Sequence, residues 1–490
     1  MINDSFVLTL RLDTNTEDEK VLEKRFRIAS HIYNVMVKEA RKRIHKLKRD
    51  KEFKRIMKNY RTSKMLSVSD KKILSDLRLL YGLSEYQFHS YLDRGQSQFK
   101  LNIDSCTRQK IGTTVWKSAE TNMFRKGRHI YYKKSSNMKS VEGKSNKTGI
   151  RFRENKILWN GLQLSVIIKN KDTYAQEVLL KHEVKYCRIV RKWHKHKYRY
   201  YVQLVMKGTP PLKHRLDIND TRKVGIDIGP STIAVVSESG IVFEELAADV
   251  NNIDNELAKL QRKLDRQRRT NNPNNYNEDG TIRRQSKNFK RSWIVSRHQK
   301  LTQDKIRTLS AKKVSSTKQS HEILANRILL LGTDIYVEDM NMQALAKRMK
   351  ETKISEKTNK YQKKKRYGKS ISNHAPAMLI EIINRKLSSV KKHVIKVNTY
   401  SIKASQLNHI TGEYNKAELS ERWKELDDTN IVQRDLYSAF LLMNCSDTVT
   451  IDINSCFDTF SDFKKKHNDL INTLRENKKA GKKYPSCMGI

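Results

Sequence analysis

The sequence has no paired cysteines and no long apolar run, and it has few acidic side chains. The five cysteines are scattered, with no Cys-x-x-Cys pair, so we expect reduced thiols and no disulfide framework. No apolar run is long enough to span a bilayer, and the N-terminus Met-Ile-Asn-Asp-Ser carries charge where a signal peptide needs an apolar core. We therefore expect a cytoplasmic protein that binds no membrane.

The shortage of acids is the feature that points to a partner. The chain has 100 Lys and Arg against 53 Asp and Glu, which gives a formal charge of +47 over 490 residues. Because the basic residues are spread along the whole chain, a long nucleic acid is favoured over a small acidic substrate. The hydrophobic content of 37% is enough to build cores, and the length predicts two to four domains.

The N-terminal half predicts a β-structure that is interrupted by helices. Residues 5–11 alternate as in a strand, helical spacing follows, and short alternating runs return after residue 149. We therefore predict a β-barrel or sheet from 1–12 and 149–215, with a helical insert at 13–148. Basic and aromatic residues interleave at 191–201, which suits either phosphate contacts with base stacking or cross-strand aromatic packing.

A single carboxylate, Asp227, lies within the apolar segment 223–229 (Lys-Val-Gly-Ile-Asp-Ile-Gly). Its alternating apolar residues predict a strand, the following Gly-Pro predicts a turn, and 231–237 reads as the hairpin partner. A lone charge between apolar strand positions needs a cation. Asp227 is therefore predicted to be a metal ligand.

The rest of the second half predicts a multidomain α+β protein with a ribonuclease H-like domain. Its expected order is three strands, a helix, a strand, a helix, a strand and a last helix. Glu338 ends the fourth strand and Asp435 lies on the last helix. We predict that 222–400 and 430–490 form this α/β domain, and that 401–429 is an insert.

Asp227, Glu338 and Asp435 could converge on one edge of such a sheet. Three clustered carboxylates would raise one another's pKa values, whereas two divalent cations about 3.5–4 Å apart would satisfy them and activate water for attack on a phosphate. Oxygen ligands select Mg²⁺ or Mn²⁺, so phosphodiester hydrolysis is the predicted reaction. Singly, each acid could instead be a turn, strand-end or solvated helix residue. Asp339 is expected to point to the opposite strand face from Glu338.

Three segments carry a family resemblance. Gly-Ile-Asp-Ile-Gly, Val-Glu-Asp-Met-Asn and Gln-Arg-Asp-Leu-Tyr-Ser-Ala-Phe resemble the split motifs of the RuvC nuclease domain in TnpB proteins and the related type V CRISPR effectors, which are Cas12-like. The resemblance implies an RNA-guided DNA endonuclease of the prokaryotic cytoplasm that cuts beside a short adjacent motif. It implies a wedge and recognition lobe in the N-terminal half. It also implies that Asp227, Glu338 and Asp435 form the magnesium-binding catalytic triad.

The partners that the resemblance implies are a guide RNA, the target double-stranded DNA and its displaced single strand. The guide could be a transposon-end RNA or a CRISPR RNA, and the oligomeric state is open. Two other classes compete: a non-cleaving RNA-guided DNA-binding regulator, and an unguided transposase or resolvase with the same fold. The intact carboxylates argue against the first, and the large basic N-terminal half argues against a simple resolvase.

The sequence departs from the family at 401–429, where many relatives carry a four-cysteine zinc ribbon. This insert has no cysteine and only His409 as a possible ligand, so we expect no zinc, and we expect His409 to be a surface or packing residue. Arg422 could contact phosphate, or be an ordinary helix-surface arginine. The basic run 363–369 could be a phosphate-binding flap or a basic linker. Its candidate phosphate contacts are Lys364, Lys365 and Arg366.

Overall fold

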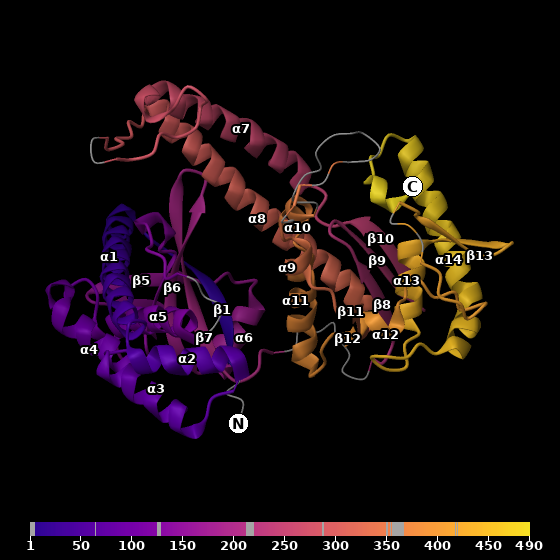
Figure 1. Cartoon of the computed structure of the whole chain (residues 1–490). Helices are drawn as coiled ribbons and strands as arrows, with labels where there is room; N and C mark the ends of the chain where they lie inside the picture. The colour runs from indigo at the N-terminus through magenta and orange to yellow at the C-terminus, as the bar shows by residue number, and fades with distance from the viewer. Residues whose placement is uncertain are drawn as a thin grey trace. The chain divides into compact units, whose positions relative to one another are not determined.

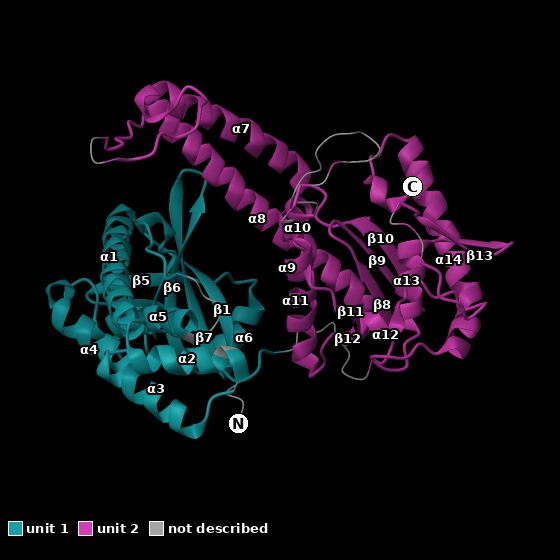
Figure 2. Ribbon diagram, in the orientation of Figure 1, with its two compact units in different colours: residues 1–211 teal, residues 212–490 magenta. Residues whose placement is uncertain are grey.

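The chain divides into two compact units, Met1–Pro211 and Leu212–Ile490 (Figures 1 and 2). The computed structural model describes residues 5–63, 65–124, 129–211, 220–286, 289–348, 351–352, 354, 367–416, 418 and 420–490. Within these ranges, no helix combines the length and the apolar composition needed to cross a membrane. The division follows the Pro210-Pro211 pair directly.

The first unit is built on a seven-stranded antiparallel sheet in the order β2-β6-β7-β1-β5-β4-β3. The strands are β1 (Ser5–Leu12), β2 (Ser140–Glu142), β3 (Arg151–Arg153), β4 (Lys156–Trp159), β5 (Leu162–Ile167), β6 (Val184–His194) and β7 (Lys197–Lys207). The sheet is curled, and among the described residues no ladder joins β2 to β3. The predicted β-structure is thus present as a curled sheet, without the hydrogen bonds that would close a barrel.

Helices pack against this sheet around one hydrophobic core. They are α1 (Thr16–Leu47), α2 (Lys51–Ser63), α3 (Val68–Leu80), α4 (Glu85–Gly95), α5 (Ser105–Phe124) and α6 (Thr173–Lys181). The core joins buried side chains of the sheet, such as Leu10 and Val202, to those of the helices, such as Phe26 and Phe88. Strand β2 lies inside the segment expected to be helical. Helix α6 interrupts the segment expected to be strands.

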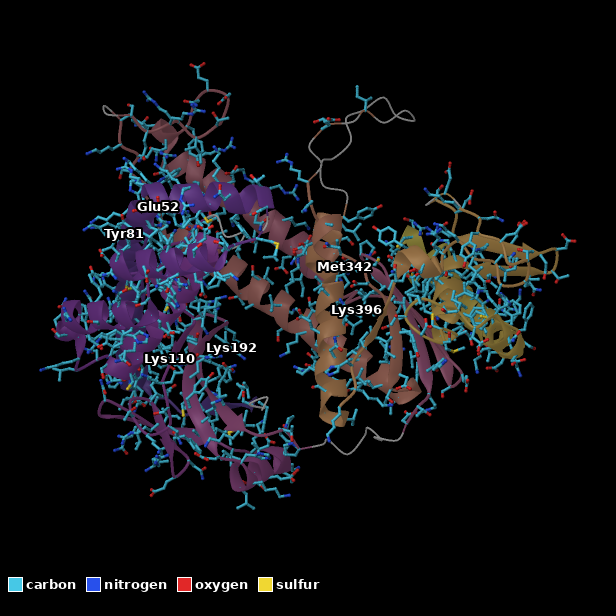
Figure 3. All side chains as sticks on the ribbon, turned by 60° about the horizontal axis from the view of Figure 1, so that its bottom comes forward. Glu52, Tyr81, Lys110, Lys192, Met342 and Lys396 are labelled. Carbon is cyan, nitrogen blue, oxygen red and sulfur yellow. The ribbon has the colours of Figure 1, made fainter. Side chains whose placement is uncertain are left out.

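The basic and aromatic segment 191–201 forms the β6–β7 hairpin. The rings of Trp193 and Tyr198 meet edge to face across the two strands, with centroids 5.1 Å apart. Arg191 is buried and donates to the carbonyl of Met138, and Lys192 lies over the ring of Tyr201 (Figure 3). These contacts support the interpretation of cross-strand packing.

The second unit is built on a mixed five-stranded sheet in the order β10-β9-β8-β11-β12. The strands are β8 (Lys223–Ile228), β9 (Thr232–Ser237), β10 (Gly240–Glu245), β11 (Asp334–Glu338) and β12 (Ile395–Val397). β8, β9 and β10 pair antiparallel, whereas β11 runs parallel to both β8 and β12. The predicted order of strands is found. The last strand, Ile395–Val397, is shorter than the predicted 391–398; the left-handed backbone of Lys391, with φ of 59°, excludes that residue from it.

Helices cover both faces of this sheet (Figure 1). They are α7 (Val250–Asn271), α8 (Arg297–Leu331), α9 (Met342–Leu345), α10 (Gly368–His374), α11 (Pro376–Leu387), α12 (Thr399–Ile402), α13 (Arg434–Met443) and α14 (Ile453–Lys479). One apolar core lies between the sheet and α8 and α11, and a second lies between the opposite face and α13 and α14. The 401–429 insert ends with strand β13 (Trp423–Asp427), which forms a hairpin with β14 (Asn430–Gln433) just beyond it; the sequence did not predict this hairpin.

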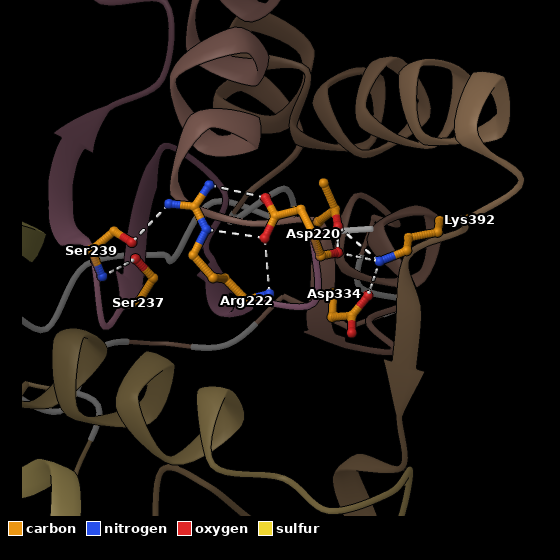
Figure 4. Close-up of polar contacts among 7 residues, drawn as sticks. Asp220, Arg222, Ser237, Ser239, Asp334 and Lys392 are labelled. Atoms are coloured by element: carbon orange, nitrogen blue, oxygen red, sulfur yellow. Dashed lines mark hydrogen bonds and ion pairs between the residues drawn. The ribbon is translucent and has the colours of Figure 1, made fainter. Parts of the chain in front are cut away.

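A polar network ties together the starts of β8 and β11 (Figure 4). Arg222 forms an ion pair with Asp220 at 2.9 Å and donates to Ser239 at 3.0 Å. Lys392 forms an ion pair with Asp334 at 2.8 Å. These contacts hold the strand starts in register, so the opposite ends of the same strands have a fixed relation to each other.

Candidate active site

Asp227 and Glu338 lie at the carboxyl ends of the neighbouring parallel strands β8 and β11. The ladder pairs Ile226 with Val337, so the next step along both strands brings Asp227 level with Glu338. Ile226 and Val337 are buried in the core under α8 and α11. Because side chains alternate along a strand, Asp227 and Glu338 point to the other face, toward α13.

Gly225 lets helix α13 lie directly on that face. A Cβ atom at Gly225 would lie 1.9 Å from the carbonyl oxygen of Ala439 and 2.4 Å from the amide nitrogen of Met443. Both are backbone atoms of the helix, so the strand tolerates no side chain here. The absence of a side chain at Gly225 therefore sets how closely α13 approaches β8.

The same contact between α13 and β8 brings Asp435 close to Asp227 and Glu338. It lies one helical turn before Ala439, on the same face of α13, whereas Asp227 lies two residues beyond Gly225 on β8. Four helical residues rise about 6 Å, and two strand residues about 6.6 Å. Because these two distances along the helix and the strand are nearly equal, Asp435 lies opposite Asp227. Gln433 fixes this turn because its side-chain oxygen accepts from the Leu436 amide at 2.8 Å.

The pKa of Asp227 reflects the nearness of the other two acids. Burial raises the pKa of Asp227 well above its usual value, and the negative charges of Asp435 and Glu338 raise it further. Burial also raises the pKa values of Glu338 and Asp435. Such a group favours either protons or a cation over three free negative charges. The structure therefore brings together the three acids that the sequence singled out.

The donor set fits a hard divalent cation by its chemistry. Its members are carboxylates, the ligands that Mg²⁺ and Mn²⁺ prefer, and their mutual repulsion is what a cation would relieve. Across the described part of the chain, no three His, Cys, Asp or Glu side chains are already gathered into a metal-binding group.

Two arginines stand beside the acids. Arg434 Nε lies 3.7 Å from Asp435 Oδ1, and its charge lowers the pKa of Asp227 against the larger effects of burial and the other acids. The positive charges of Arg434 and Arg422 also counteract the rise in the pKa of Asp435. Arg422 precedes β13, so the helix-surface alternative is wrong. The analysis of the sequence missed Arg434, although its position next to Asp435 was a signal.

The remaining residues that the sequence singled out are Asp339, His409 and the basic run that contains Lys364, Lys365 and Arg366. Asp339 is exposed and forms an ion pair at 2.9 Å with Lys396, which is labelled in Figure 3. His409 is buried beside Phe440 and Phe460, and its Nδ1 lies 2.7 Å from the Tyr437 hydroxyl, which confirms a packing role. Lys364, Lys365 and Arg366 lie outside the described residues.

Comparisons with known proteins find similar solved structures only. No protein-family model and no curated protein matches the chain. The chain is similar to the cryo-EM structure of the Cas12f1–sgRNA–target DNA complex, with 11% identity over 90% of this chain and 99% of that one, and a TM-score of 0.43. It is also similar to a CRISPR–Cas12f ternary complex, with 12% identity over 89% and 83% of the two chains and a TM-score of 0.26. Cas12f proteins are type V CRISPR effectors, the group that the three motifs resemble.

Proposed function

We propose that this chain is an RNA-guided, magnesium-dependent DNA endonuclease with a ribonuclease H-like RuvC domain. The observation that carries the proposal is the convergence of Asp227, Glu338 and Asp435 on one face of the β8–β11 pair, under the first turn of α13. A structural role explains this poorly, because three half-buried acids oppose one another unless a cation or protons neutralise them.

The acidic and basic residues of the site would have different roles. Asp227, Glu338 and Asp435 would hold divalent cations, and Arg422 and Arg434 would pair with a phosphate of the strand to be cut. When bound, the cations supply an activated water and stabilise charge on the scissile phosphate. The rigid strand ends fix two of the acids, and the Gly225 contact fixes the third. The chain thus presents an anionic site beside two cationic side chains.

The guide and the target follow from the motifs and the charge. The three motifs resemble those of guided nucleases, and a formal charge of +47 suits a protein that holds an RNA–DNA duplex by its backbone. An unguided transposase or resolvase is the alternative. We expect the protein, expressed with its native flanking DNA, to copurify with a defined RNA that has a constant scaffold and a variable end.

Sequencing that RNA tests the proposal. The complex should then cut a plasmid that carries the matching sequence in the presence of Mg²⁺, and leave an unmatched plasmid intact. The constant part would show whether the guide comes from a transposon end or a CRISPR repeat. If no specific RNA is bound and both plasmids are cut alike, the unguided alternative replaces the proposal.

A further inference from the structure

A hollow of about 1000 Å³ lies in the first unit. A smaller one in the second unit is connected by hydrogen bonds to the turn that carries Asp435. The smaller hollow, of about 530 Å³, lies between the β13–β14 hairpin and α14. Trp423 and Ile431 line it from the hairpin, and residues from His467 to Arg475 line it from the helix. Its volume falls in the range of small-ligand sites, about 300–1,000 Å³. We call it the Trp423 hollow.

The hollow has a fixed aromatic wall. The indole nitrogen of Trp423 donates to the Gly489 carbonyl at 3.1 Å, and its ring meets His467 edge to face. The guanidinium of Arg475 lies 5.1 Å from the centre of the indole ring, and Ile431 is 47% exposed beside it. A held aromatic ring, a cation and an apolar neighbour are the groups on which an unpaired base stacks.

The opposite wall offers amide groups. Asn468 and Asn472 are exposed and lie one turn apart on α14. The Asn468 oxygen faces His467 Nδ1 at 3.0 Å, which leaves its NH₂ group for a ligand. Within the described part of the chain, the side chain of Asn472 makes no hydrogen bond. Paired amides of this kind bind the polar edges of bases, because each amide is both a donor and an acceptor.

Hydrogen bonds join the hollow to the turn that carries Asp435. His467 Nε2 accepts from the Gln433 amide at 2.9 Å, and Gln433 caps α13 at Leu436. Trp423 pairs with Gln433 in the hairpin, and the Arg434 amide donates to the Arg422 carbonyl at 2.9 Å. A group in the hollow would therefore have a fixed offset from the carboxylates.

We propose that the Trp423 hollow holds one unpaired nucleobase of the DNA strand whose backbone passes Arg422 and Arg434. This inference rests on the proposed function for the identity of the strand. The face of the base would stack against Trp423 and Arg475, and its edge would form hydrogen bonds with Asn468 and Asn472. The captured base sets which phosphate reaches the acids. The hollow therefore acts as a positioning subsite for single-stranded DNA.

Photocrosslinking tests this without requiring cleavage. The full-length Asp227→Asn variant is irradiated with single-stranded DNA that carries 5-iodouracil, and crosslinked peptides are mapped by mass spectrometry. We expect a crosslink at Trp423. Adding Arg475→Ala, which removes a stacking partner, or Asn472→Ala, which removes a contact with the base edge, should lower its yield about tenfold; both residues are exposed. Tyr400→Ala, at a residue 87% exposed in the same unit, is the control and should leave the yield unchanged.

Three results decide the inference. An unmodified Trp423, or a yield that Arg475→Ala and Asn472→Ala leave unchanged, would overturn it. A stronger crosslink at Trp423 from the matching RNA oligonucleotide would assign the hollow to RNA and overturn the DNA assignment. A crosslink at Trp423 together with a wild-type protein that cuts no DNA would support the subsite while rejecting the proposed nuclease, so the two failures remain distinguishable.

Discussion

At the scale of single residues, the account depends on acids that the fold brings together at a cost in free energy. Asp227, Glu338 and Asp435 all have raised pKa values, with burial as the first cause. A folded carboxyl group with a raised pKa holds its proton more tightly than the unfolded group does. Its contribution therefore lowers the stability of the folded state as pH rises from the ordinary carboxyl range through the raised pKa.

This sign gives a prediction for the metal-free protein. Asp227→Asn should raise the free energy of unfolding at pH 7 by about 1–3 kcal/mol, because it removes one of three opposed charges. The gain over wild type should shrink toward pH 4, where the acids are protonated. Thermal melts across this pH range in a chelator measure it. Asp339→Asn is the matched control, since Asp339 is exposed and ion-paired; an equal gain there would contradict the account.

Single residues also show how far sequence reasoning reached. Alternation around Asp227 and the end of the strand at Glu338 were enough to predict both positions. Arg422 and Arg434 were harder, because their roles depend on the β13–β14 hairpin. The first strand of this hairpin, Trp-Lys-Glu-Leu-Asp, has no alternation of apolar residues. Its turn is stabilised by hydrogen bonds that the Asp427 carboxylate accepts from the amides of Thr429 and Asn430.

At the scale of elements, the packing of α13 on β8 positions the site. The sequence predicted both elements, but their closeness depends on Gly225, whose missing side chain a pattern of apolar residues does not explain. Helix α6 was missed although Asp172 caps it, with its side chain accepting from the Ala175 amide at 3.0 Å. A helix of nine residues has too few turns for its periodicity to stand out.

Gly225→Ala should disturb both stability and the site. Its Cβ would meet helix backbone at 1.9 Å, and neither element can yield without moving. We expect a loss of about 1–3 kcal/mol or more in unfolding free energy, measured by urea denaturation. Gly240→Ala, whose Cβ would meet only Leu331 Cδ2 at 3.4 Å, is the control in the same sheet. Equal behaviour of the two variants would argue against close seating of α13.

At the scale of the whole molecule, the apolar cores stabilise the fold, whereas the net charge determines which partners the protein attracts. Among the described residues, the first unit has one apolar core and the second has two. A few arginines such as Arg191 pack against core rings, but the formal charge of +47 as a whole bears on the partner. Composition alone was enough to predict a polyanionic partner, because net charge does not depend on how the chain folds.

The charge predicts a steep dependence of nucleic-acid binding on salt. Because bound phosphates release condensed counterions, the affinity of the Asp227→Asn variant for double-stranded DNA should fall about a thousandfold or more between roughly 50 and 200 mM salt. Fluorescence anisotropy with labelled DNA measures this fall. An affinity that stays constant over that range would mean that the positive charge serves another purpose.

The central claim is that three carboxylates form one divalent-dependent nuclease centre. The most direct test compares the Mg²⁺-dependent cleavage rate of the guide-loaded wild-type protein with those of Asp227→Asn and Asp339→Asn. Losing a ligand that stabilises several kcal/mol of transition-state charge predicts a fall of about a thousandfold or more for Asp227→Asn, with DNA binding retained. Asp339→Asn should cut at the wild-type rate. Undiminished cleavage by Asp227→Asn would contradict the account.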